Sequence, residues 1–265
     1  MMENKTDKNS YTILFAIGMV LVVGALLAFT ASSLKPAIYE NVRLEKQQNI
    51  LYAMGINDND ESSAVFISTD KAPEAFNANI KEQMVITVDV DDNILKTQTR
   101  DEYFSETKEE PYLIDVKKEQ ANLKAGKPRK LPLFVGEREG QTYYVAPIYG
   151  KGLWDAIWGY IAMDKDMVVR GAYFDHKGET PGLGANIKQR FFMDDFYGEH
   201  LLTESGVFKG INVAKGNADP KNKDKTDNEV DAIAGATITG DGVTAMIKSD
   251  LKLYKPYFDN LKNSN

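Results

Sequence analysis

Residues 11–31 carry no charged side chain, and most of them are apolar. About 20 such residues cross the hydrocarbon core of a bilayer as a helix, which satisfies its own backbone polar groups. The sequence therefore predicts an N-terminal tail over 1–10 and one transmembrane helix over 11–31. The alternative is a cleaved signal peptide with Lys5 and Lys8 in its basic region, but this apolar run exceeds the roughly 7 to 15 residues typical of such peptides.

Charges flank both ends of this segment, so the positive-inside rule gives no orientation. Lys5 and Lys8 precede it, and Lys35, Arg43 and Lys46 follow it. The residues alone leave both sides of the membrane open for the rest of the chain.

The composition excludes several classes of function. The 265 residues have a formal net charge of −7 and a pI near 5.1, which argues against a nucleic-acid-binding surface. There is no cysteine, and His176 and His200 are the only histidines, so no thiolate metal site, iron–sulfur cluster or His-rich metal site is expected. Any redox role requires an organic cofactor.

Hydrophobic periodicity beyond the membrane segment predicts an α+β fold. Residues 32–60 are expected to form a membrane-proximal stalk region, with a helix from Pro36 to Met54 that stops at Gly55. Residues 61–265 are expected to form one domain with a mainly antiparallel sheet and packed helices. Strands are predicted over 84–90, 142–148, 158–163, 168–174 and 207–213.

Two charged stretches, 106–110 and 117–130, lack sustained apolar periodicity and predict a solvated excursion with some helix. Residues 218–229 predict a charged loop. The last part of the chain predicts a helix, because its apolar residues recur at intervals of three and four. These residues are Val243, Ile247, Leu251, Tyr254 and Phe258.

The segment from Asp231 to Thr239 reads Asp-Ala-Ile-Ala-Gly-Ala-Thr-Ile-Thr and stands directly before this helix. Gly235 permits positive φ or close backbone approach, Ala236 keeps the surroundings small, and free N–H groups at a helix start favour an anion. The pattern therefore places the hydroxyl of Thr237 where a phosphate would be held. The alternative is an ordinary helix N-cap.

Two further loops are rich in glycine. Gly150-Lys-Gly-Leu-Trp154 puts Leu153 and Trp154 where they could form a wall for a flat aromatic ring, although Trp154 could also belong to the core. His176-Lys-Gly-Glu-Thr-Pro-Gly-Leu-Gly184 predicts a rigid turn, with a plain strand-to-helix connection as its alternative.

The three loops together resemble a known family. The segment 231–239 resembles the flavinylation motif of proteins that carry FMN in phosphodiester linkage to its threonine, and Thr237 aligns with that acceptor. The order and spacing of the three loops, and the membrane-proximal region from Leu34 to Gly55, resemble the NqrC subunits of sodium-translocating NADH:quinone reductases. One departure is Ala234, where the family usually has Ser or Thr.

This resemblance implies that FMN is covalently bound to Thr237 after maturation by a flavin transferase. It also implies a single-pass protein of the bacterial inner membrane, whose FMN domain lies on the outer, periplasmic side and relays electrons between carriers of a multi-subunit translocase. Catalysis belongs to the whole complex, so no catalytic residue or metal ligand is assigned, and the partners are the other subunits and the lipid bilayer. The implied cofactor-binding residues are Asp231, Gly235, Ala236, Thr237, Thr239, Leu153, Trp154, Glu179, Thr180, Pro181, Gly182, Leu183 and Gly184.

Two other readings stay open. The RnfG subunits of the related Rnf electron transport complexes share the anchor, the Thr-Pro-Gly-Leu-Gly loop and the flavinylated threonine, although Gly152-Leu153-Trp154 favours the NqrC family. A membrane-anchored binding module without a cofactor is the second alternative, since the chain has no nucleophile–base constellation.

Overall fold

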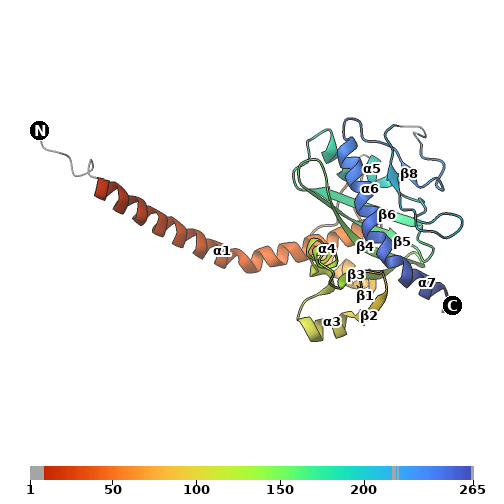
Figure 1. The fold of residues 1–265 in the computed structure, drawn as a ribbon, viewed down its shortest axis with the longest axis horizontal. Coiled ribbons are helices and arrows are strands. Elements are labelled where there is room, and N and C mark those ends of the chain that lie inside the picture. The colour runs from red at the N-terminus through yellow and green to blue at the C-terminus, as the bar shows by residue number, and fades with distance from the viewer. Residues whose placement is uncertain (1–8, 62, 217–218, 220, 264–265) are drawn as a thin grey trace, which may run out of the picture. The chain divides into compact units, whose positions relative to one another are not determined.

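The computed structural model describes residues 9–61, 63–216, 219 and 221–263, and the chain divides into two compact units, Met1–Arg43 and Leu44–Asn265. The first described element is the helix α1, Asn9–Ala53 (Figure 1). It is exposed from residue 9 to residue 42, and its most apolar window has a mean hydropathy of 2.7. Within the described ranges it is the one helix long and apolar enough to cross a membrane.

A single helix runs through both the predicted membrane segment 11–31 and the first part of the predicted stalk region 32–60. Its last turns, which include Ile50, Leu51 and Ala53, are fully buried and belong to the second unit. The predicted stop at Gly55 is confirmed. Gly55 has φ 76°, and the Ile56 N–H donates to the Leu51 carbonyl at 2.9 Å, as in a glycine-terminated helix.

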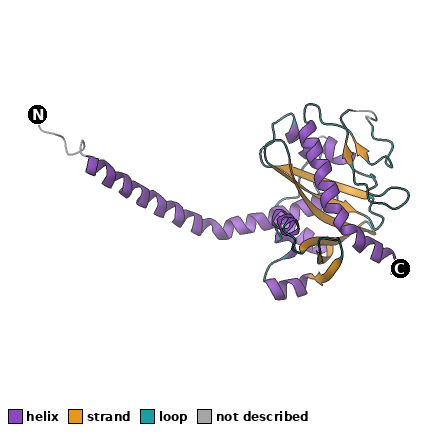
Figure 2. Cartoon of the chain, viewed as in Figure 1, coloured by secondary structure: helices purple, strands orange, loops and turns teal. Residues whose placement is uncertain are grey.

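A six-stranded antiparallel sheet in the order β2-β1-β3-β4-β5-β6 forms the centre of the second unit (Figure 2). The predicted α+β class and the antiparallel pairing are confirmed, as are the strands predicted near residues 84, 142, 158 and 168. The strands are β1 Ile80–Val88, β2 Ile94–Thr99, β3 Arg129–Arg138, β4 Gln141–Lys151, β5 Ala156–Met163 and β6 Val169–His176.

One strand was missed, and one strand prediction was wrong. The central strand β3 begins inside the stretch that was predicted to be solvated. It was missed because Pro132 and the flanking charged residues interrupt the apolar pattern of its buried residues Leu131, Leu133 and Phe134. The predicted strand 207–213 is reduced to a bridge between Leu202 and Phe208 and to β7, Asn212–Val213. Strand β7 pairs in parallel with β8, Glu229–Val230.

Helices cover both faces of the sheet (Figure 1). On one face, Gly150 of β4 lies against Met246 of α6, and the ring of Tyr144 packs on Phe258 of α7 at 5.1 Å. On the other face, Tyr173 of β6 packs on Tyr52 of α1 at 5.8 Å. The covering helices are α2 Ala72–Asn79, α5 Arg190–Asp195, α6 Thr237–Leu251 and α7 Lys255–Asn263.

The predicted C-terminal apolar stripe is confirmed, since all five of its residues are buried. A short 3₁₀ turn, Lys252–Tyr254, joins α6 to α7. The charged stretches contain some helix, as predicted. The end of α3, Arg100–Thr107, reaches into the first stretch, and most of α4, Val116–Lys124, lies in the second. A 3₁₀ turn at Pro111–Leu113 lies between the two stretches.

Candidate functional site

The segment predicted to hold a phosphate forms the tight turn between β8 and α6. Gly235 has φ 71°, and the Ala236 N–H donates to the Ile233 carbonyl at 3.0 Å. Thr237 is the first residue of α6 and is exposed. Ala236 stands at the N-cap and supplies no side-chain hydrogen bond, so the first N–H groups of α6 have no capping acceptor from that position. Such a helix start attracts an anion.

A cavity of about 250 Å³ opens beside Thr237 and gathers the three glycine-rich loops. The β4–β5 hairpin contributes Leu153, and the α6 turn contributes residues 235–239. The loop after β6 contributes Glu179, Thr180, Leu183 and Gly184, the last of which begins a short 3₁₀ helix, Gly184–Lys188. The loops therefore meet although they lie far apart in the sequence.

Glu179 joins the three loops beneath the cavity. Its side chain is 4% exposed, its Oε1 accepts from the Trp154 N–H at 2.9 Å, and its Oε2 accepts from the Thr239 hydroxyl at 2.5 Å. Burial alone would raise the pKa of this carboxyl. The hydrogen bonds from Thr239 and from the backbone of Trp154, Leu153 and Asp155 outweigh burial, so the pKa lies below its ordinary value. Glu179 is therefore an ionised carboxylate that orders the loops.

Two glycines allow these loops to approach one another. A Cβ on Gly184 would lie 2.5 Å from both Glu179 Oε2 and Thr239 Oγ1. A Cβ on Gly235 would lie 2.8 Å from Leu183 Cδ2 and would also be strained by the positive φ. The close contact between the loops therefore depends on the absence of side chains at both positions.

Comparison with known proteins agrees with this geometry. Residues 152–252 match the FMN-binding domain family. The chain is 30% identical to the NqrC subunit of the Na(+)-translocating NADH-quinone reductase from Parabacteroides distasonis, a crystal structure, with 85% of this chain and 96% of that chain covered and a TM-score of 0.65. The chain belongs to the NqrC family.

Other members of the NqrC family extend the likeness over nearly the whole chain. The protein from Pasteurella multocida is 28% identical, with 99% of this chain and 97% of the relative covered. The protein from Neisseria meningitidis serogroup B is 27% identical, with 99% of each covered. The structure of NqrC from Shewanella oneidensis, at 23% identity and a TM-score of 0.59, has the same fold.

Most of the residues that the sequence proposed as cofactor contacts in this NqrC homologue line the cavity. Asp231, Trp154, Pro181 and Gly182 lie outside its wall. The Asp231 N–H instead donates to Asp195 Oδ2 at 3.1 Å, and its side-chain pKa is raised by burial and by neighbouring carboxylates, chiefly that of Asp195. Asp231 therefore connects the turn to α5.

Trp154 is not a core residue, because its side chain is 67% exposed. Its indole Nε1 donates to the Thr180 hydroxyl at 3.1 Å, and its backbone N–H donates to Glu179. It lines a second, larger cavity, of about 700 Å³. Trp154 thus lines the larger cavity and is hydrogen-bonded to two residues, Thr180 and Glu179, that line the Thr237 cavity.

Sequence reasoning missed Ile238 as a wall residue. Ile238 is 56% exposed and lines the cavity directly after the proposed acceptor. Leu153, 45% exposed, and Leu183, 41% exposed, complete an apolar rim. A large apolar residue at the exposed second position of a helix is the signal that could have identified it.

Proposed function

We propose that this chain is the electron-transfer subunit of a sodium-translocating NADH:quinone oxidoreductase and carries FMN in phosphodiester linkage to Thr237. The observation that carries the proposal is the exposed Thr237 hydroxyl at the uncapped start of α6, beside an apolar-rimmed cavity. A phosphodiester keeps one negative charge, which the free N–H groups and the dipole of the helix start stabilise.

The three nearby threonines differ in their availability as acceptors. The Thr239 side chain is 1% exposed and its hydroxyl donates to Glu179. The Thr244 hydroxyl accepts from the Val213 N–H at 2.8 Å on a half-buried side of α6. Thr237 is exposed and borders the cavity, so it is the acceptor that these surroundings favour.

The residues around the cavity fit a flavin attached through its phosphate. Leu153, Leu183 and Ile238 would supply apolar contact to the ring system, and Glu179 would hold the loops that carry two of them. At about 250 Å³ the cavity is smaller than the roughly 300 to 1,000 Å³ of typical ligand pockets, so the exposed rim would extend the contact surface. Bound FMN supplies one- and two-electron transfer, which the side chains of this chain do not provide.

The proposed location is the bacterial inner membrane, with residues 11–31 as the anchor and the FMN domain on the outer side. NADH oxidation and sodium passage would belong to partner subunits, in agreement with the lack of ionisable residues between Tyr11 and Ala31.

Because the chain has no cysteine, Glu204→Cys would introduce a single exposed thiol. We expect an impermeant maleimide to label it in intact spheroplasts; labelling only after lysis would contradict the outward orientation.

Flavin attachment can be tested by in-gel fluorescence after denaturation, in cells that contain the flavin transferase. The wild-type chain should give a fluorescent band, and Thr237→Ala should give a dark one. Thr239→Ser, which keeps a hydroxyl for Glu179, and Thr244→Ala should stay fluorescent. A fluorescent Thr237→Ala band would refute the proposed acceptor, and a dark wild-type band would refute the flavoprotein.

The flavin transferase would have to recognise the turn that contains Ala234. Ala234 is exposed and precedes Gly235, so the larger serine side chain at this position would extend into solvent and not into the core. If a hydroxyl at this position assists recognition, Ala234→Ser should raise the flavinylated fraction measured by intact-protein mass.

A further inference from the structure

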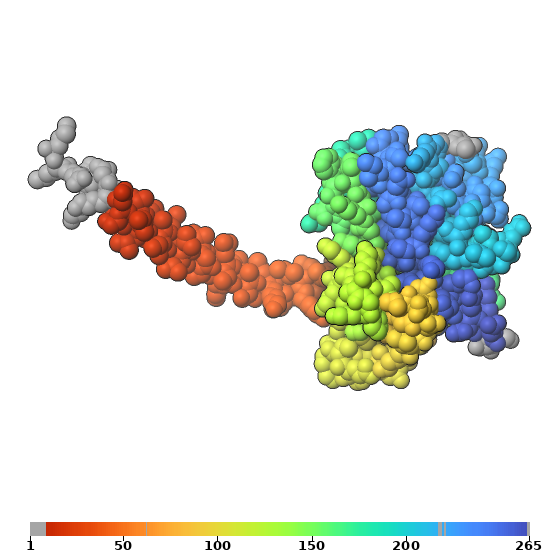
Figure 3. All heavy atoms as spheres, in the orientation of Figure 1, coloured from red at the N-terminus to blue at the C-terminus, as the bar shows by residue number. Residues whose placement is uncertain are grey.

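The larger of the two cavities beside Trp154 is a groove of about 700 Å³ between α4, the β4–β5 hairpin and α6. Small residues form part of its wall, among them Ala121, Gly150, Gly242 and Ala245. Figure 3 shows α6 in blue with the green hairpin and the yellow-green α4 along the same flank. The groove does not include Thr237 and is not used by the proposed flavin attachment.

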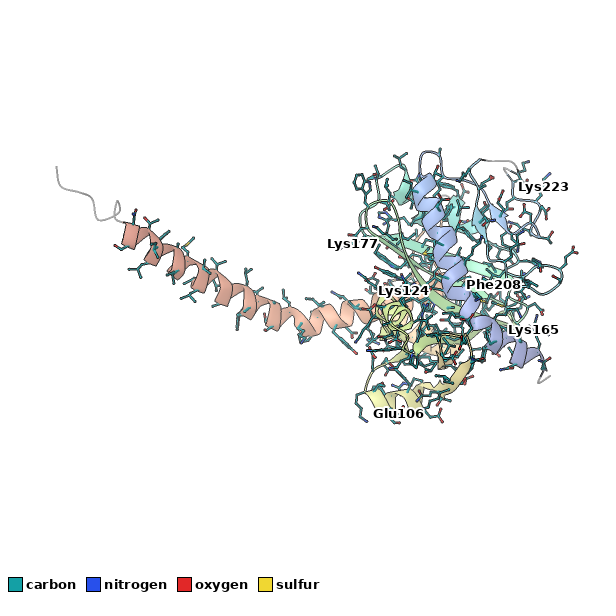
Figure 4. All side chains as sticks on the ribbon, in the orientation of Figure 1. Glu106, Lys124, Lys165, Lys177, Phe208 and Lys223 are labelled. Atoms are coloured by element: carbon teal, nitrogen blue, oxygen red, sulfur yellow. The ribbon has the colours of Figure 1, made fainter. Side chains whose placement is uncertain are left out.

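The charges that line the groove are mainly positive. Lys117, Lys124 and Lys151 are exposed, and within the described ranges no carboxylate lies at salt-bridge distance from them. Figure 4 labels Lys124 on α4, close to α6 in this view. The formal net charge of the chain is −7, so this cluster of lysines is a local positive region on a molecule with a net negative charge.

The two carboxylates in the groove wall are already engaged. Asp155 forms an ion pair with Lys177 at 3.0 Å. Asp250 is completely buried and accepts from Arg129 at 2.9 Å, from Gln120 at 2.9 Å and from the Tyr149 N–H at 2.8 Å. Asp155 is still close enough to Lys117 for the lysine charge to help lower the Asp155 pKa, so these acids offset the charge of the three lysines only in part.

Aromatic groups accompany these cations. The Trp154 ring is 67% exposed, and the Lys117 ammonium lies 6.0 Å from the centre of the Tyr149 ring. Exposed aromatic residues next to cations are typical of the centres of protein interfaces, where they provide large contact areas at low entropic cost.

We propose that this groove binds an acidic polypeptide segment of another subunit of the reductase. The cations come from two elements and are spread along the mouth, which suits carboxylates spaced along a chain. The N-terminal turn of α6, which would suit a compact phosphate, does not line the groove. The first turn of α4 reaches the groove through Lys117, but its N-terminus is already capped by the Asp115 carboxylate, which accepts from the Lys118 N–H at 3.1 Å. Small residues in the wall leave room for a backbone.

The proposal rests on the proposed place of the chain in a multi-subunit complex. A partner segment that covers the Trp154 indole would hold this side chain in one position. It would also restrain the β4–β5 hairpin, because the Trp154 N–H in that hairpin donates to Glu179. Partner docking would then order the loops around Thr237.

Carbodiimide cross-linking of the purified complex tests the groove directly, since it joins a lysine amine to a carboxylate in contact with it. Mass spectrometry should find Lys117, Lys124 or Lys151 joined to Asp or Glu of another subunit, and these products should decrease at high salt. If those lysines remain unlinked while other lysines of the chain form intersubunit links, or if they bind only small anions or lipid, the proposal is wrong.

Charge reversal provides the second test. Lys117→Glu/Lys124→Glu should reduce the amount of this chain that copurifies with its partners by about tenfold at moderate salt, because like charges would face each other. Lys71→Glu/Lys165→Glu makes the same charge change outside the groove and should leave copurification unchanged. Equal losses in both variants, or none in the first, would overturn the proposal.

In-gel flavin fluorescence separates the two proposals. The groove variant should keep its covalent flavin, because Thr237 is untouched. Loss of copurification with a fluorescent band supports the groove. A dark wild-type band would instead show that the flavin assignment has failed, whatever the cross-links show.

Discussion

Glu179 and Glu199 are two buried glutamates of the same compact unit, and their surroundings have opposite effects. Glu179 accepts hydrogen bonds from Thr239 and from the backbone of the β4–β5 hairpin, and its pKa is lowered. Glu199 is completely buried, and neither of its carboxylate oxygens accepts a hydrogen bond of regular geometry from the described residues, although Asn222 and Lys225 lie close enough to act on its pKa. Burial raises its pKa to about 7, although Asn222 and Lys225 oppose the shift.

The difference shows that hydrogen-bond donors, and not burial, decide whether a buried carboxylate supports this fold. Glu179 lies where three loops converge, and four donors reach it: the Thr239 hydroxyl and the backbone of Leu153, Trp154 and Asp155. Glu199 follows α5, where Lys225 approaches Oε1 only at 3.5 Å. The first carboxylate therefore serves the candidate site as an anion, whereas the second costs stability whenever it is ionised.

The largest effect is expected for Glu179→Ala. This change leaves the Trp154 N–H and the Thr239 hydroxyl without their acceptor and opens a cavity between the loops, at a cost of about 3 to 4 kcal/mol. Glu179→Gln should cost much less, because its carbonyl can accept from Trp154 while its amide donates to the Thr239 oxygen. Urea unfolding of the full chain in detergent, followed by tryptophan fluorescence, measures both. Equal costs would show that the hydrogen bonds are unimportant.

Glu199→Gln should stabilise the fold, whereas Glu179→Ala should destabilise it. The folded-state pKa of about 7 exceeds the ordinary value of 4.5, so the folded state binds the extra proton and stability falls as pH rises between these values. The full difference in pKa corresponds to about 3 kcal/mol of folding stability. Because the substitution also loses the contact with Lys225, we expect Glu199→Gln to raise the free energy of unfolding by about 2 kcal/mol at pH 8. At pH 4.5 the gain should vanish.

The control for this pH dependence is Glu204→Gln, which removes a carboxylate from an exposed turn and should change stability little at either pH. The measurement is the free energy of unfolding of each variant at pH 4.5 and pH 8. A Glu199→Gln chain that is less stable than wild type at pH 8 would mean that Glu199 is well paired in the folded state.

The same contrast explains how much the sequence could predict. Local signals worked where the deciding interaction is local. Gly55 ends α1, the spacing from Val243 to Phe258 gives a buried stripe, and Thr237 begins a helix after a positive-φ glycine. The convergence of the loops was inferred from their resemblance to a family.

Long-range partners could not be predicted in this way. Glu179 reaches Thr239 across 60 positions, and Asp250 reaches Arg129 across 121. No pattern around Glu199 distinguishes its surroundings from those of Glu179. Strand β3 was missed because charged residues and a proline interrupt its apolar sequence, while its pairing with the distant strand β1 leaves no local signal.

Gly184→Ala tests the space around the Glu179 carboxylate. The new Cβ would lie 2.5 Å from Glu179 Oε2 and from Thr239 Oγ1, and we expect a loss of about 1.5 kcal/mol. Gly178→Ala is the matched control, because its Cβ would meet only Asp155 Cβ at 3.8 Å and its φ is ordinary. If both substitutions are neutral, the loops have room that the structure does not show.

The smallest effect isolates the single bond between Thr239 and Glu179. Thr239→Val keeps the shape of the buried side chain but removes the hydroxyl donor, and should cost about 1 kcal/mol, whereas Thr239→Ser should retain most of the stability. Combining Thr239→Val with Glu179→Gln forms a double-mutant cycle on this contact. The paired loss should be less than the sum of the single losses, since each change removes part of the same bond. Strict additivity would assign the stabilisation by Glu179 to the hairpin backbone alone.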